Sequence, residues 1–184
     1  KTAITLNNVL NWSINHPEMP KIELKFQDLS GLNFEYTDLS NSDFRRSNFD
    51  TAKISNVNFT RTNLSYSDLS GSDLTGTILV GADLTGVNLT DVDLSDKDLT
   101  GTILTGADLS NANLTGVDLS GKDLTGVNLT GVDLSDKDLT GTILTGADLS
   151  NTNLTGVDLS NTNLTGVDLS GKDLTGTILT GADL

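Results

Sequence analysis

Few side chains in this sequence are of the kinds that do covalent chemistry at neutral pH. Nucleophilic and general-base catalysis usually draws on cysteine or histidine, and the 184 residues include no cysteine and one histidine, His16, directly before Pro17. A lone histidine near a chain end is more often structural or solvated than catalytic. We therefore predict that the protein is not an enzyme and uses no cofactor.

Aspartate offers the other candidate chemistry. Asp91, Asp93, Asp96 and Asp98 lie close together, and carboxylate oxygens are ligands that Ca²⁺ prefers. However, the spacing lacks the glycine and the closing glutamate of an EF-hand loop, and it does not match the glycine-rich nonapeptides of calcium-binding repeats. We predict no specific metal site.

The charge is distributed unevenly along the chain. The formal net charge is -14, from 25 acidic and 11 basic side chains, but residues 1–61 hold seven of each, so the remainder has 18 acids against four lysines. Such a surface argues against direct binding to nucleic-acid phosphates or anionic lipid and favours a protein partner with a basic surface. The sequence contains no run of about 18 apolar residues, so it predicts no membrane-spanning helix.

The elements that must position these aspartates follow a period of five. Every fifth residue from Leu24 to Leu184 is apolar. Neither a strand nor a helix could place all of these residues in one core, because their periods are about 2.0 and 3.6. We predict that each unit of five is a short extended side plus a turn, with the leucine inward, a small residue such as Ala82 or Val87 beside it, and turn-forming residues after it.

The first residues do not follow this pattern. Leu6, Val9, Leu10 and Ile14 predict a short helix over residues 5–16 that ends before Pro17, and alternation over residues 22–26 predicts a strand. We expect residues 1–26 to form a cap over the first repeat, with Trp12 contributing to the cover. Because the chain begins without methionine and stops within a repeat, we expect a fragment with an open C-terminal coil, either monomeric or associated end to end.

The repeat resembles that of the pentapeptide-repeat family. Its pattern, A(D/N)LXX, is nearly literal at residues 82–86, 107–111, 112–116 and 147–151, and the resemblance covers residues 27–184. It implies an all-β fold, a right-handed quadrilateral parallel β-helix with 20 residues per coil, in which the leucine and the small residue point inward. At that coil length, Leu84, Leu104, Leu124 and Leu144 should stack inside.

Two groups of residues depart from the family pattern. Four lysines occupy the small inward position, and we expect their stems to pack inside while the ammonium groups reach a neighbouring aspartate: Lys97, Lys122, Lys137 and Lys172. Four isoleucines stand where the family places aspartate or asparagine facing solvent: Ile78, Ile103, Ile143 and Ile178.

One outward row of the predicted coil holds four consecutive aspartates: Asp98, Asp118, Asp138 and Asp158. We refer to these four residues as the aspartate row. The row is the candidate binding site, because stacked like charges invite a basic surface. A structural alternative is partial neutralisation by Lys97 and Lys137, which directly precede two of the four.

Two functions follow from these features. The first is a non-catalytic module, a stiff acidic rod for protein–protein interaction, similar to segments of bacterial secreted effectors. The second is that of family members that resemble duplex DNA in shape and charge and act on type II topoisomerases. The repeats here carry one net negative charge per ~2 Å of rod length, which is near the one charge per ~1.7 Å of B-DNA. Those relatives dimerise through a C-terminal cap, which this sequence does not show. The compartment stays open between the bacterial cytoplasm and secretion into a host cell.

Overall fold

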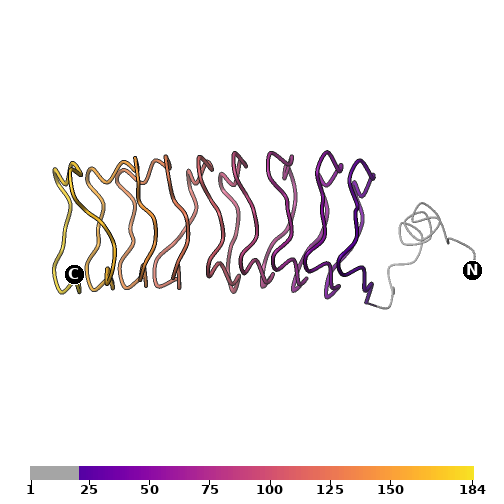
Figure 1. Cartoon of the computed structure of the whole chain (residues 1–184), viewed down its shortest axis with the longest axis horizontal. Coiled ribbons are helices and arrows are strands. Elements are labelled where there is room, and N and C mark those ends of the chain that lie inside the picture. The colour runs from indigo at the N-terminus through magenta and orange to yellow at the C-terminus, as the bar shows by residue number, and fades with distance from the viewer. Residues whose placement is uncertain (1–20) are drawn as a thin grey trace, which may run out of the picture.

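The coils of the chain stack along one axis. The structure is a computed structural model that describes residues 21–184, and Figure 1 shows them as successive turns of one coil running from indigo to yellow. Residues 21–184 contain no helix, and hence none that is long and apolar enough to cross a membrane. The predicted helix at residues 5–16, with Trp12 and His16, lies outside the described residues.

Neighbouring coils pair through single residues rather than long strands. All twenty pairings are parallel and join residues twenty positions apart, such as Glu23 with Asp43 and Asn128 with Asp148. They fall into four rows, which begin at Glu23, Asp28, Asn33 and Asp38. The predicted four-sided parallel coil of 20 residues is therefore confirmed.

Each corner is a tight turn. The amide of the small inward residue donates to the carbonyl of the leucine three positions before it, as Val87 does to Leu84 at 3.1 Å. The residue before the small one has a positive φ, which is the geometry of a type II turn and favours glycine or asparagine. Gly86, with φ at 60°, and Asn111, with φ at 56°, are examples. This requirement explains the glycine, asparagine or aspartate at that position of the repeat.

The core is a column of aliphatic side chains. Leu84, Leu104, Leu124 and Leu144 are each at most 1% exposed, as predicted from their spacing. The small inward residues, Ala82, Val87 and Ala107 among them, are buried beside the leucines. The first coils hold four buried phenylalanine rings in contact, with centroids 5.7 to 6.4 Å apart: Phe34, Phe44, Phe49 and Phe59.

The strand expected at residues 22–26 reduces to one pairing, that of Glu23 with Asp43. Ile22 and Leu24 pack against the core as expected. Phe26 does not, because it occupies a corner with φ at 58° and its side chain points outward. The alternation of apolar residues therefore ends at Leu24, where the first corner begins.

Candidate functional site

The aspartate row lies on one outward side of the coil. Asp98, Asp118 and Asp138 are exposed and Asp158 is half-buried. The row continues above and below through Ile78 and Ile178, and Asp138 pairs with Asp158 and Asp158 with Ile178. The twenty-residue spacing thus places all four carboxylates on the same face, as the sequence predicted.

Each carboxylate of the row also closes its own turn. Its Oδ1 accepts the backbone amide two residues further on, at 2.8 to 2.9 Å, from Thr100, Ser120, Thr140 and Ser160. Asparagine makes the same bond elsewhere, as Asn128 does with the Thr130 amide at 3.0 Å. This side-chain hydrogen bond therefore needs an oxygen acceptor but no charge. The negative charge of the row is free for another role.

Hydrogen bonding lowers the pKa of three carboxylates of the row. The hydroxyl and then the amide of Ser120 lower the pKa of Asp118, and the charge of Lys122 lowers it further. Thr100 and Thr140 lower the pKa of Asp98 and Asp138 in the same way. The charge of Asp118 acts in the opposite direction on Asp138 without reversing its shift. Hydrogen bonds to the charged form thus outweigh repulsion along the row.

The inward lysines open the coil. Within residues 21–184, two pairings are missing beside each of the four lysines, one on the side before the lysine and one on the side after it. Beside Lys122, for example, Asp98 does not pair with Asp118, and Ile103 does not pair with Asp123. We call each such pair of openings a lysine seam. One further pair, Lys53 and Asp73, is unpaired next to the buried hydroxyl of Ser72, which has no partner among the described residues.

The lysine ammonium groups turn to the backbone. Nζ of Lys122 donates to the carbonyl of Leu99 at 2.8 Å, Nζ of Lys137 to that of Val117 at 3.4 Å, and Nζ of Lys172 to that of Leu149. No salt bridge within the described range involves these lysines. The prediction that their heads pair with aspartate was therefore wrong for these three. Each of these three ammonium groups instead donates to a backbone carbonyl of the coil below, that of a leucine or of Val117.

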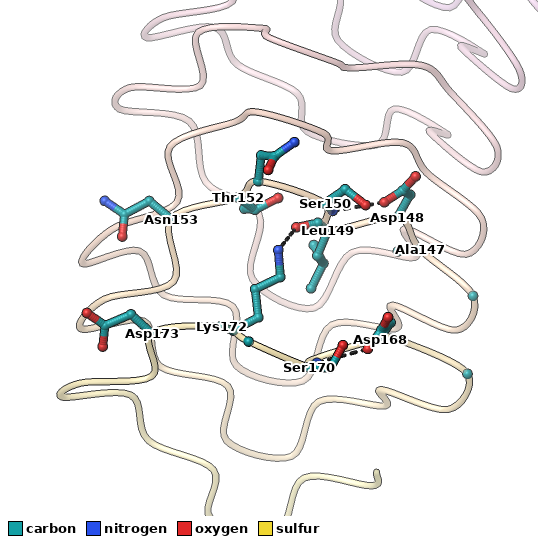
Figure 2. Close-up of a pocket in the computed structure, with 14 residues that line it drawn as sticks. Ala147, Asp148, Leu149, Ser150, Thr152, Asn153, Asp168, Ser170, Lys172 and Asp173 are labelled. Carbon is teal, nitrogen blue, oxygen red and sulfur yellow. Dashed lines mark hydrogen bonds between the residues drawn. The ribbon is translucent and has the colours of Figure 1, made fainter.

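Each seam leaves a hollow between two coils. The largest, about 670 Å³, surrounds Lys172, and Figure 2 shows the lysine reaching from its own coil to the Leu149 carbonyl, flanked by Asp148 and Asp168. Hollows of about 300 to 340 Å³ lie at the other three lysines. A lysine side chain is longer than the interior position accommodates, so the coils separate around it.

The seams divide the aspartate row. The seam of Lys122 separates Asp98 from Asp118, and the seam of Lys137 separates Asp118 from Asp138, so that only Asp138 and Asp158 are paired. The expected neutralisation of Asp98 by Lys97 and of Asp138 by Lys137 was wrong.

The charge of each inward lysine acts on the aspartate four residues before it. Lys122 lowers the pKa of Asp118, Lys97 that of Asp93, and Lys137 that of Asp133. Within the aspartate row, the charge of Lys122 lowers the pKa of Asp98 and Asp118, whereas the lowered pKa of Asp138 has no lysine among its causes.

The isoleucines and the four clustered aspartates are distributed over several sides and corners of the coil. The four isoleucines are 40% to 50% exposed, as expected, and lie in two of the four rows. Asp91 and Asp96 occupy corners, whereas Asp93 and Asp98 lie on different sides. In the part of the chain that the structure describes, no three histidine, cysteine or acidic residues are grouped to hold a metal ion.

Comparisons with known proteins agree with this architecture. The family model described as pentapeptide repeats matches in eight copies between residues 28 and 184. No curated protein sequence matches the chain.

Three solved structures illustrate the structural similarity. HetL, a pentapeptide-repeat protein involved in heterocyst differentiation regulation in the cyanobacterium Nostoc sp. strain PCC 7120, is 26% identical with a TM-score of 0.59, over 96% of this chain and 93% of its own. QnrB1, a plasmid-mediated fluoroquinolone resistance protein, is 22% identical with a TM-score of 0.47, over 89% and 90%. Rfr23 from the cyanobacterium Cyanothece 51142 is 21% identical with a TM-score of 0.36, over 85% and 87%. The last two likenesses are too weak to support an argument about function.

Proposed function

The chain belongs to the pentapeptide-repeat family, and from this premise we propose that it is a non-catalytic binding module, a rigid acidic rod that docks a basic protein surface through its aspartate row. Proteins of this family form right-handed β-helices, the sense that parallel crossover connections favour. The paired coils and the continuous buried core give the rod its stiffness.

The observation that carries this proposal is that the two oxygens of each carboxylate in the aspartate row have different surroundings. Oδ1 accepts the turn amide, and no hydrogen bond within residues 21–184 engages Oδ2 of Asp98, Asp118, Asp138 or Asp158. One oxygen of each therefore stabilises the fold while the other can accept a lysine or arginine donor. Because all four lie on one side, a single basic surface could contact them together.

The experiment replaces the charge of the row without changing its turns. The fourfold variant Asp98→Asn, Asp118→Asn, Asp138→Asn and Asp158→Asn retains the Oδ1 acceptors. Its affinity for a decalysine peptide is compared with that of the original chain by calorimetry at low salt. Each exposed ion pair contributes about 0.5 kcal/mol, so we expect a loss of roughly 2 kcal/mol, or ~30-fold.

A matched control removes the same number of charges from another side. The row of Asp28 holds both aspartate and asparagine, and its Asp68, Asp108, Asp148 and Asp168 make the same turn bonds. Replacing these four by asparagine should weaken binding by no more than about 3-fold, the effect of net charge alone. Equal losses in both variants would mean that total charge, and not the aspartate row, attracts the peptide.

The alternative, mimicry of duplex DNA for a type II topoisomerase, predicts a different result. The original chain would then inhibit supercoiling or relaxation by such an enzyme, and charge removal from either row would relieve the inhibition. A docking module specific to the aspartate row would leave the topoisomerase unaffected. The two assays on the same three proteins therefore separate the candidates.

A further inference from the structure

Three exposed side chains stack along one corner of the first coils. Phe26, Arg46 and Tyr66 are twenty residues apart and so stand one above another. The guanidinium carbon of Arg46 lies 5.8 Å from the centre of the Phe26 ring and 5.3 Å from that of Tyr66. Cation–π attraction at these distances holds the arginine between the two rings. We call these three residues the aromatic ridge.

The backbone of the ridge is strained. Phe26, Arg46 and Tyr66 have φ values of 58°, 57° and 59°, where bulky side chains are rare. The same corner is glycine in every later coil: Gly86, Gly106, Gly126, Gly146 and Gly166. Each departure from glycine costs about 1 kcal/mol.

The ridge is rigid as well as exposed. Phe26 is 64% and Tyr66 57% exposed, yet the Tyr66 ring lies so close over Gly86 that a Cβ there would be 2.6 Å from it. The amides of all three residues are bonded to the next coil, that of Arg46 to the Ser65 carbonyl at 2.8 Å. A large, exposed and pre-ordered surface of aromatic and arginine side chains has the composition of interface hot spots.

The stacking determines which ligand group fits. With a ring near each face, the guanidinium of Arg46 can recognise a partner only through its N–H edge, and no carboxylate within residues 21–184 forms an ion pair with it. That edge matches a planar, bidentate acceptor. We propose that the aromatic ridge is a second docking surface, for a protein segment that presents one carboxylate among apolar side chains.

The charge of the remaining chain favours this partner over a polyanion. Residues beyond 61 hold 18 acidic side chains and four lysines, and they would repel a nucleic acid or a long acidic segment that ran along the rod. A single carboxylate flanked by apolar residues avoids this repulsion and covers the rings. The proposal does not depend on the aspartate row, which lies on later coils and selects the opposite charge.

The test begins with a displayed library of random twelve-residue peptides, from which those that bind the full chain are selected. The affinity of the selected peptides is then measured for variants of the chain. We expect enriched peptides to combine one aspartate or glutamate with aromatic or aliphatic neighbours. Arg46→Gln should weaken these peptides at least 10-fold. Arg46→Lys should restore little of this affinity, because lysine retains the positive charge but lacks the planar pair of N–H donors of the guanidinium.

Matched controls separate the ridge from general stickiness. Tyr66→Ala should weaken binding about as much as Arg46→Gln, whereas Tyr36→Ala, at an exposed corner on which no arginine of residues 21–184 is stacked, should leave it unchanged. Thermal unfolding checks that each variant folds. If Arg46→Gln does not fold, Arg46→Lys takes its place as the test of the guanidinium. Failure to enrich such peptides, binding that survives loss of Arg46, or preferential binding of a (dT)12 oligonucleotide would overturn the proposal.

Discussion

Lys122 and Leu99 are joined across two coils by a hydrogen bond of 2.8 Å from the lysine ammonium to the leucine carbonyl. Forty residues later in the same interior row, the hydroxyl of Thr162 makes the equivalent bond to the carbonyl of Leu139 at 3.0 Å. Threonine makes it without opening the coil, since Asp138 pairs with Asp158 there, while Asp98 and Asp118 are unpaired beside Lys122. The carbonyl is satisfied in both cases, and the length of the side chain decides whether the coils stay in contact.

Substituting Lys122→Thr should close its seam. The amides of Leu99, Leu104, Asp118 and Asp123 donate no backbone hydrogen bond within residues 21–184 and should exchange rapidly in the original chain. Hydrogen–deuterium exchange should show these four amides becoming protected in the variant, because threonine allows the coils to pair.

The reverse change is the control. Thr162→Lys should deprotect the amides of Leu139 and Asp158, which now bond to Asp158 and Lys137. Unchanged exchange in both variants would show that the seams have a cause other than the lysines.

Removing one core leucine should destabilise the whole rod. Leu124 is fully buried between the leucines of the coils above and below. Leu124→Ala removes buried apolar surface and leaves a cavity, so the free energy of unfolding should fall by roughly 2–5 kcal/mol. Urea unfolding followed by circular dichroism measures it, and a change below about 1 kcal/mol would contradict the stacked core.

Two glycines with the same backbone conformation should differ in tolerance. Gly71 and Gly86 both have φ at 60°, but a Cβ at Gly71 would meet nothing within 4 Å, whereas one at Gly86 would meet the Tyr66 ring. Gly71→Ala should cost about 1 kcal/mol for the left-handed backbone. Gly86→Ala should cost roughly 1–3 kcal/mol more. In a double-mutant cycle, Tyr66→Ala should remove that excess; if it persists, the ring is not its source.

The first coils should be sensitive to acid through Asp43. This carboxylate is 2% exposed and contacts Arg45 Nε at 3.0 Å and Lys25 Nζ at 3.3 Å. The hydrogen bonds from Arg45 are the main reason that its pKa is well below the usual range. A depressed folded-state pKa stabilises the fold fully above the unfolded value of about 4 and loses that stabilisation as the pH falls through the folded value.

The variant Asp43→Asn isolates this contribution. At pH 7 it should unfold more easily by roughly 1–2 kcal/mol, moderated because water screens the half-exposed Arg45. Between pH 4 and 2 the difference from the original chain should shrink. Thermal unfolding at several pH values measures the trend, and Asp38→Asn, at an exposed carboxylate, is the control. A gap that stays constant with pH would refute the assignment to Asp43.

The regular part of the fold could be predicted because every fifth residue from Leu24 to Leu184 is apolar. The residue types and the spacing of Leu124 and Ala82 predict that both side chains point inward. The twenty-residue coil then places Asp138 below Asp158. The outward aspartate row follows from the same counting.

The seams and the ridge could not be predicted in the same way. Lys122 occupies an inward position, and the sequence does not reveal whether its ammonium reaches an aspartate or a carbonyl, because that depends on distances between coils. Phe26 looked like the last inward residue of a strand, since alternation cannot show where a corner begins. The twenty-residue spacing of Phe26, Arg46 and Tyr66 was a visible signal, but only once the corner was known.

Titration of the ¹⁵N-labelled chain with decalysine, followed amide by amide, tests the docking face most directly. The amides of Thr100, Ser120, Thr140 and Ser160 donate to the aspartate row and should show the largest chemical-shift changes, which salt should reverse. Equal or larger changes at Ser70, Ser110, Ser150 and Ser170, which donate to the control row, would contradict the account.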